Sequence, residues 1–187
     1  MSIEGPWNVT FDTILGGPEK AVFEYLSDWS KNSAKEIKFY SGIAAYSKSF
    51  NLPDSVIKNN NSDIYLDLGI VRNIASVTLN GKDLGAIWTS PWQVNISDAV
   101  RNGNNHLIIE VANLWVNRLI GDESEPWDGI ENGKWPEWIF SGTKRPTKRY
   151  TFATYRPYKK DDKLIESGLL GPVRLLETTR SSIQVKL

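Results

Sequence analysis

The sequence predicts an all-β fold, a sandwich or jelly roll, on three observations. Apolar and polar residues alternate in short stretches such as AYSKSFNL from Ala45, and a period of two is typical of strands with one buried face. Turns rich in glycine, proline and asparagine separate these stretches. The pair Asn80-Gly81 between two of them is the strongest short hairpin signal. Short strands punctuated in this way favour a sandwich or a jelly roll.

The first strands are expected from the alternation alone. They are WNVTF from Trp7, AYSKSFNL from Ala45, IYLDLG from Ile64 and SVTLNG from Ser76. In each, every second side chain can face a core. The last of them and the following KDLG are expected to form a hairpin, because a type I′ turn needs positive φ at both central positions and Asn-Gly tolerates this best.

The second half of the chain continues the pattern. NISDAV predicts a single helical turn capped by Ser97 or Asp98, whose oxygens can accept from free amides two or three residues on. HLIIEVANLW from His106 is the next strand, and GPVRLLET from Gly171 and SIQVKL from Ser182 are the last ones. Terminal strands of a closed sandwich often pair with the first ones, so the strand at Trp7 is their expected neighbour.

Residues 1–187 are expected to form a single β-sandwich domain, because domains usually hold about 100 to 200 residues. A long loop at about 116–148 interrupts the alternation. It carries Trp127, Trp135 and Trp138 among acids, glycines and prolines. Loops of this length inside a compact domain are usually functional or disordered.

The composition argues against several partners. The 22 basic and 22 acidic side chains cancel, and no block of Lys and Arg marks a local field, so nucleic acid is not an expected partner. No stretch approaches the roughly 20 apolar residues that cross a bilayer, so no membrane partner is expected either. The absence of cysteine excludes disulfides and Cys-based zinc sites and leaves the compartment open.

The residues offer little catalytic chemistry. A Ser-His-Asp triad would need His106, the only histidine, at the start of a strand where a solvated side chain is expected. Glycoside hydrolysis needs two carboxylates about 5 to 10 Å apart, and six loop acids could supply them: Asp122, Glu123, Glu125, Asp128, Glu131 and Glu137. We favour a solvated loop, because catalysis needs a preorganised shell. No cofactor is expected to be required, and a structural calcium ion is the alternative use of an oxygen-rich loop.

The aromatic residues suggest a carbohydrate site, because such sites combine apolar stacking with a few placed polar groups. The candidates are Trp88, Asn113, Trp115, Asn117, Arg118, Asp122, Trp127, Trp135 and Trp138. On a strand, residues 113, 115 and 117 would share one face. The competing interpretation places Trp115 in the core and pairs Arg118 with an acid. Trp7, Trp29 and Trp92 are expected to be structural.

Several stretches resemble the galactose-binding-like β-sandwich, a jelly roll found in large glycoside hydrolases. YLDLGIVRNIASVTLNGKDLGAIWTSPWQVNISDAV from Tyr65 is similar to the sugar-binding domain of glycoside hydrolase family 2. NLWVNRLIGD and GLLGPVRL are closer to the C-terminal domain of family 106, the α-L-rhamnosidases. The resemblance implies a periplasmic or extracellular protein in which hydrolysis occurs in a separate (β/α)₈ barrel, so no catalytic residue is expected in this chain.

Three functions follow from these observations. The first is a non-catalytic carbohydrate-binding or accessory domain of a glycoside hydrolase in polysaccharide degradation, with a carbohydrate and the catalytic domain of the parent enzyme as partners. The second is a purely structural domain that packs against the catalytic barrel and exposes a contiguous apolar patch in isolation. The third, less favoured, is a small stand-alone glycosidase that uses loop carboxylates.

Overall fold

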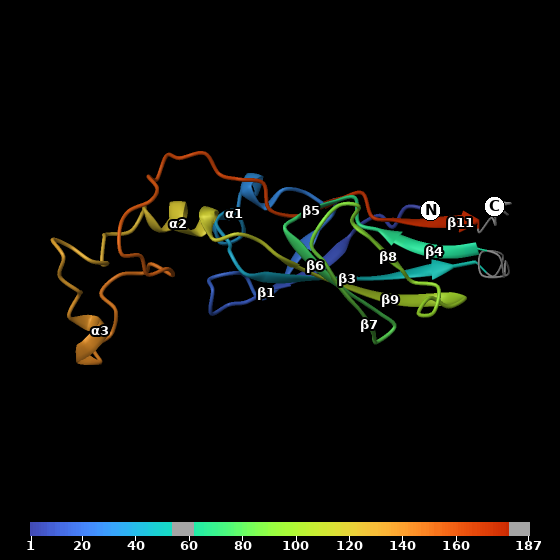
Figure 1. The fold of residues 1–187 in the computed structure, drawn as a ribbon, viewed down its shortest axis with the longest axis horizontal. Coiled ribbons are helices and arrows are strands. Elements are labelled where there is room, and N and C mark those ends of the chain that lie inside the picture. Colours follow the sequence, from blue (N-terminus) through green and yellow to red (C-terminus); the bar gives the residue numbers. More distant parts are fainter. Residues whose placement is uncertain (54–61, 180–187) are drawn as a thin grey trace, which may run out of the picture.

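The protein is a β-sandwich from which a long extension projects (Figure 1). The computed structural model describes residues 1–53 and 62–179. The larger sheet has six strands in the order β2-β1-β3-β9-β6-β7. Their bounds are β1 Trp7–Phe11, β2 Ala21–Phe23, β3 Ile43–Leu52, β6 Ile74–Leu79, β7 Lys82–Ile87 and β9 Gly103–Ala112.

The opposing layer consists of two smaller sheets. One has the order β11-β4-β8 and the other pairs β10 with β5. Their bounds are β4 Ser62–Asp67, β5 Ile70–Arg72, β8 Gln93–Asn95, β10 Gly168–Gly171 and β11 Arg174–Thr179. The 3-10 helix η1 (Trp29–Lys31) and the short helix α1 (Lys35–Lys38) lie between β2 and β3. The predicted all-β sandwich is confirmed.

An aromatic cluster joins the two layers. Trp29 is fully buried, and its indole Nε1 donates to the Tyr46 hydroxyl at 2.5 Å. The same hydroxyl accepts from the backbone N of Leu169 on β10 at 3.3 Å, and burial raises the pKa of Tyr46. Trp7 is 1% exposed, and Trp92 packs partly buried against the core. The three tryptophans predicted to be structural therefore are so.

The Asn80-Gly81 hairpin is confirmed. Leu79 of β6 pairs with Lys82 of β7, and the two residues between them have φ of 52° and 83°. A type I′ turn requires positive φ at both central positions, and this is why Asn-Gly predicts such a turn.

The helical turn after β8 is present, but its predicted cap is wrong. The backbone N of Val100 donates to the carbonyl of Ile96 at 2.9 Å. The side chain of Asn95, rather than Ser97 or Asp98, accepts from the backbone N of Ser97 at 2.9 Å. The hydroxyl of Ser97 instead accepts from the backbone N of Ile64 on β4 at 2.9 Å. The local pattern assigned the Ser97 side chain to capping the turn, but it bonds to the neighbouring strand β4 instead.

The predicted pairing of the terminal strands is wrong for β1. This strand lies between β2 and β3, and β11 pairs with β4. The residues before β1 do meet the segment that leads into β11, because the backbone N of Ile3 donates to the carbonyl of Val173 at 2.9 Å. The strand predicted from Ser182 lies outside the described residues.

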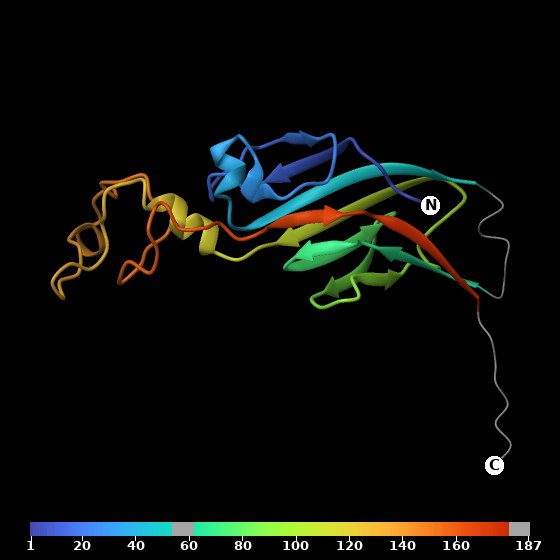
Figure 2. The same cartoon turned by 90° about the horizontal axis from the view of Figure 1, so that it is seen from above.

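The extension occupies the chain between β9 and β10. It contains α2 (Val116–Asp122) and α3 (Trp138–Ser141). Residues 142–167, which we call the return leg, bring the chain back to the sandwich. Figure 2 shows that the extension leaves the end of the sandwich opposite the N-terminus. No helix among residues 1–53 and 62–179 is long and apolar enough to cross a membrane.

Candidate functional site

The base of the extension is built from predicted site residues, but not in the predicted geometry. β9 ends at Ala112 and α2 begins at Val116, so residues 113, 115 and 117 do not share the face of one strand. Asn113, the residue after β9, is bonded to the segment before β3. Its side chain accepts from the backbone N of Gly42 at 3.0 Å and donates to the carbonyl of Tyr40 at 2.8 Å. Trp115 is 48% exposed where α2 begins, which contradicts a core position.

Asn117 clamps the two legs of the extension together. Its side chain is fully buried, donates to the carbonyl of Ile165 at 2.8 Å and accepts from the backbone N of the same residue at 2.9 Å. The side-chain amide of Asn117 therefore bonds to both backbone groups of Ile165, as the backbone of a paired strand would. With both polar atoms engaged and no exposed surface, Asn117 is a structural residue.

Arg118 and Asp122 fix the next turn of α2 to the return leg. The Arg118 guanidinium donates to the carbonyl of Leu15 at 3.2 Å and lies 4.4 Å from the centre of the Tyr150 ring. Burial lowers its pKa. The Asp122 carboxylate accepts from the backbone N of Tyr150 and from both the backbone N and the hydroxyl of Thr151, at 2.7–2.9 Å. Both side chains are buried, so neither is accessible to a ligand from solvent.

Two buried carboxylates hold the outer half of the extension. Glu123 pairs with Arg149 and with Arg156, and Asp128 accepts from both Nε and Nη2 of Arg145, at 2.5 and 2.8 Å. Burial alone would raise the pKa of each carboxyl, but hydrogen bonds and the arginine charges outweigh it, so that both pKa values lie below the ordinary range. Their oxygens are engaged by arginine.

Two of the loop tryptophans belong to this network. The guanidinium groups of Arg149 and Arg156 lie 5.1 and 5.6 Å from the centre of the Trp127 ring. The Trp138 indole donates to the carbonyl of Asp128 at 3.1 Å, and Arg145 lies 4.9 Å from its ring centre. Arginine stacked on an aromatic face keeps its charge while covering apolar surface. These rings therefore stabilise the extension.

Trp135 is different, because 53% of its surface is exposed. One side of its ring is stacked on Phe152 with 5.8 Å between ring centres and 15° between planes. Phe140, itself 75% exposed, approaches its edge at 6.3 Å. The indole is thus held in place while part of it stays open to solvent.

A depression of about 430 Å³ lies beside Trp135, and we call it the distal pocket. Its apolar lining includes Trp127, Trp135, Trp138, Pro136 and Pro146, and its polar lining includes Asp128, Glu131, Asn132 and Lys134. Of the nine predicted site residues, the structure brings three together here. Trp88, Asn113, Trp115, Asn117, Arg118 and Asp122 do not line this pocket.

Three polar residues of the lining, Glu131, Asn132 and Lys134, belong to a second Asn-Gly turn. We call them the polar rim of the pocket. Glu131 and Lys134 exchange backbone hydrogen bonds of 3.2 and 2.9 Å, and Asn132 and Gly133 have φ of 51° and 74°. Asn132 and Lys134 are absent from the predicted site. The signal was present in ENGK, but the flanking residues lack the alternation that makes such a pair conspicuous.

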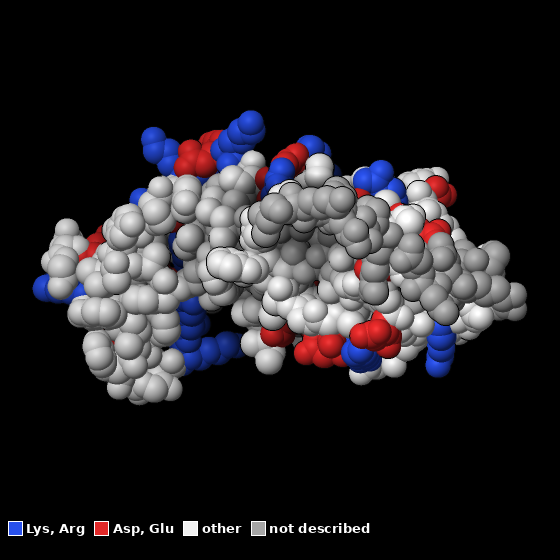
Figure 3. All heavy atoms as spheres, turned by 45° about the vertical axis from the view of Figure 1, so that its right-hand side comes forward, with Lys and Arg blue, Asp and Glu red and all other residues white. Residues whose placement is uncertain are grey.

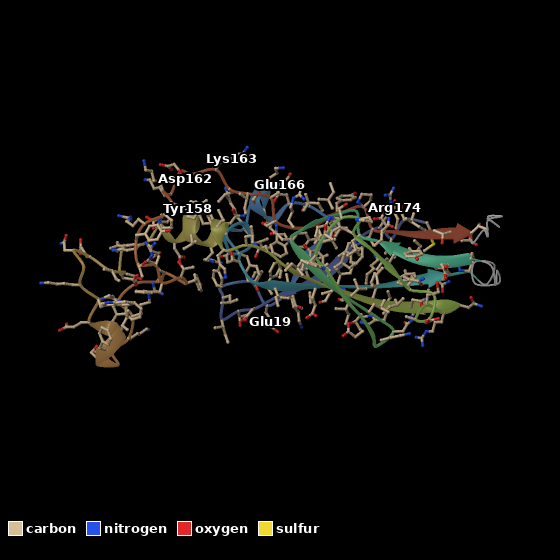
Figure 4. All side chains as sticks on the ribbon, in the orientation of Figure 1. Glu19, Tyr158, Asp162, Lys163, Glu166 and Arg174 are labelled. Atoms are coloured by element: carbon tan, nitrogen blue, oxygen red, sulfur yellow. The ribbon has the colours of Figure 1, made fainter. Side chains whose placement is uncertain are left out.

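Charged side chains of both signs occur on the rest of the described surface (Figure 3). The labelled side chains Tyr158, Asp162, Lys163 and Glu166 follow the return leg, away from α3 (Figure 4). On the face in Figure 3, basic and acidic atoms of the described residues are interspersed. In the described part of the chain, no group of three or more His, Asp or Glu side chains could hold a metal ion.

The β-sandwich fold agrees with the protein family that this sequence matches. The family described as glycosyl hydrolase 2 galactose-binding domain-like matches residues 28–147, which is more than half of the chain. The chain belongs to this family. The galactose-binding-like jelly-roll fold implied by the sequence resemblance is thereby confirmed.

Relatives place the domain in larger enzymes. A protein of Formosa agariphila named "Putative beta-glucuronidase" is 41% identical over 179 residues, which is 94% of this chain and 15% of that protein. The structure of a rhamnosidase from Novosphingobium sp. PP1Y matches 95% of this chain with a TM-score of 0.78 and 35% identity, over 15% of its own length. The beta-glucuronidase of Ruminococcus gnavus shares the fold over 60% of this chain and 20% of its own, with a TM-score of 0.50 and 21% identity.

This chain therefore spans about 15% of the length of the curated relative that it matches. It is a galactose-binding-like domain of the kind found in glycoside hydrolases, and its match extends through the extension as well as the sandwich.

Proposed function

We propose that this chain is a non-catalytic accessory domain of a glycoside hydrolase and that it binds carbohydrate in the distal pocket. The observation that carries the proposal is Trp135, a half-exposed indole that borders a pocket with Glu131, Asn132 and Lys134 on its lining. A sugar ring offers an apolar C–H face and hydroxyl groups at its edge. The pocket offers an aromatic surface for the first and charged and amide groups for the second.

The pocket is preorganised for such a ligand. Phe152 supports one side of the Trp135 ring, and the two positive-φ residues of the Asn132-Gly133 turn fix the polar rim. A binding surface whose side chains are already ordered loses less conformational entropy when a ligand arrives. The pairs of Glu123 and Asp128 with arginine hold together the segment that carries this surface.

The loop acids support a non-catalytic role. Asp122 is engaged by Thr151 and the backbone, Glu123 by Arg149 and Arg156, and Asp128 by Arg145. A general acid in glycoside hydrolysis needs a raised pKa, whereas the pKa values of Glu123 and Asp128 are lowered. The size of the relatives also supports it, because the matched segment is only 15% of the Formosa agariphila protein.

The test is calorimetric titration of the chain with rhamnose-containing and glucuronic-acid-containing oligosaccharides. Wild type should bind at least one of them saturably, and Trp135→Ala should weaken that affinity about 30-fold, since truncating an anchoring aromatic costs about 2 kcal/mol. Trp88→Ala is the matched control, because Trp88 is 77% exposed but lies outside the pocket. Equal affinities of the two variants, or a flat titration over the whole panel, would contradict the proposal.

Activity is a separate readout. The chain should release no aryl alcohol from aryl α-L-rhamnosides or aryl β-D-glucuronides, with or without calcium. Turnover abolished by Glu131→Gln or Glu137→Gln would overturn the non-catalytic assignment.

A further inference from the structure

A row of apolar side chains crosses the outer face of the six-stranded sheet where the extension begins. Ile43 of β3 pairs with Ala112 of β9, and Ala112 pairs on its other side with Ile74 of β6. Ile43 and Ile74 are 55% and 46% exposed. Their strand neighbours Ala44 and Ala75 are fully buried, so the two isoleucines point away from the core.

Two further exposed apolar residues adjoin this triplet, one along the chain and one across the sheet. Leu114, two residues beyond Ala112, is 48% exposed. Trp88 is 77% exposed and directly follows Ile87, which pairs with Ala75, the neighbour of Ile74. We call Ile43, Ile74, Trp88, Ala112 and Leu114 the apolar row. Single exposed apolar residues are normal on a soluble protein, whereas contiguous ones mark interaction surfaces.

The rest of this face carries few charges. Next to the row, the outward positions Ala45, Glu110 and Ser76 pair across β3, β9 and β6, and Ser47, Ile108 and Thr78 pair one step further on. The Glu110 carboxylate accepts from the Ser76 hydroxyl at 3.2 Å, so it lies along the sheet. A surface with few charges and an exposed aromatic residue has the composition of an interface core. The distal pocket has the mixed apolar and polar composition of a ligand site.

We infer that the apolar row docks onto another domain of the same polypeptide in the glycoside hydrolases that contain this domain. In the two relatives above 30% identity, this chain corresponds to 15% of a protein that is several times longer, so a tethered partner surface is available. Interfaces between domains of one chain commonly bury about 600–1,500 Å². Because Leu114 leads directly into α2, a domain that covers the row would also lie next to the base of the extension.

The occupant should present an apolar, uncharged surface. An anionic or cationic partner would leave its charges unpaired against Ile43, Ile74 and Trp88, at a desolvation cost that no group of the row offsets. The inference is independent of sugar binding, because the row and the distal pocket share no residue.

The absence of cysteine in this sequence makes thiol labelling a direct test. Ile74→Cys is placed in this chain alone and in a chimera in which this chain replaces the matching segment of the Formosa agariphila relative. Maleimide labelling of the Ile74→Cys peptide is followed by mass spectrometry. The control is Val22→Cys on the edge strand β2, 60% exposed and outside the row.

In the isolated chain, both cysteines should react at similar rates. In the chimera, Ile74→Cys should react at least tenfold more slowly, and Val22→Cys should be unchanged. Equal rates for Ile74→Cys in the two proteins would overturn the inference. Slow labelling in the isolated chain that depends on its concentration would also overturn it, because the row would then be a contact between two copies.

A second variant checks the same surface through stability. Ile74→Thr keeps a β-branched side chain on the strand, so the melting temperature of the isolated chain should stay nearly unchanged. In the chimera it should fall by several degrees, and an equal shift in both proteins would contradict docking.

Discussion

The sandwich buries an apolar core, whereas the extension is held by charges. Among the described residues, the hydrophobic core cluster contains none between Val111 and Leu169. Residues 113–166 are instead held together by two kinds of arginine contact. Arginine forms ion pairs with buried Glu123 and Asp128, and arginine stacks on Trp127 and Trp138. α2 and α3 have only seven and four residues, so neither supplies a stable helix by itself.

The difference has an energetic consequence. A thin projection has too little interior to gain much from apolar burial, and buried ion pairs gain little net stability because desolvation offsets their attraction. What such pairs do provide is a large penalty when one partner is removed. We therefore expect the extension to open locally at a lower free energy than the sandwich, as a separate cooperative unit.

The largest expected effect is in the sandwich core. Trp29→Ala should lower the free energy of unfolding by about 3–5 kcal/mol, because it removes a fully buried indole and one of the two donors to the Tyr46 hydroxyl. Urea denaturation followed by far-ultraviolet circular dichroism measures this loss. A change below about 1 kcal/mol would contradict a core held by this residue.

Arg149 should be the corresponding weak point of the extension. Its side chain is 2% exposed and pairs with Glu123, whereas Arg156 pairs with the same carboxylate at 54% exposure. Arg149→Met should destabilise the extension by about 3 kcal/mol, because the buried Glu123 carboxylate loses its buried partner and keeps only the exposed Arg156. Limited proteolysis should then cut within residues 116–165 while the urea midpoint of the sandwich stays in place.

Arg156→Met is the matched control. Exposed ion pairs contribute about 0–1 kcal/mol, so this variant should resist proteolysis nearly as wild type does. Equal cleavage of the two variants would show that burial does not decide the strength of these pairs.

Acid should separate the two regions. The pKa values of Glu123 and Asp128 lie below their ordinary values of 4.5 and 3.8. Their contribution to stability is therefore present above those values and is lost as the pH falls through the lowered values. Among the described residues of the sandwich, Asp28 is the one carboxyl whose pKa is also lowered. The sandwich should therefore weaken less than the extension, which has two such carboxyls. Hydrogen exchange followed by mass spectrometry from pH 5 downward should show amides of 116–165 opening first.

The smallest effect comes from the two Asn-Gly turns. Gly81 and Gly133 have φ of 83° and 74° with nothing near an added Cβ, so Gly→Ala at either position adds only backbone strain of about 1–2 kcal/mol. Gly81→Ala should lower the melting temperature of the sandwich by a few degrees. Gly133→Ala should leave that temperature unchanged and weaken only the sugar binding that we propose for the distal pocket. A global loss of stability from Gly133→Ala would contradict two separate units.

The sequence by itself determined the longer strands and the first hairpin, because both are local. The strands of three or four residues, β2, β5, β8 and β10, were not predicted. Alternation in AYSKSFNL and HLIIEVANLW reports which side chains face inward within one strand, and Asn80-Gly81 reports its own backbone angles. The family resemblance was readable for the same reason, since it rests on contiguous motifs. The same local rules failed after Ala112, where apolar residues next to Trp115 fit a strand and a helix equally well.

The tertiary structure decided what each side chain of the extension does. Asn117 bonds to Ile165, Asp122 to Thr151 and Glu123 to Arg149, partners far away in the sequence that no spacing rule connects. The apolar row likewise exists only because β3, β9 and β6 pair in the register that aligns Ile43, Ala112 and Ile74. Local pattern fixes which way a residue points within its own element, but only the packing of distant elements fixes which groups it meets and which remain exposed.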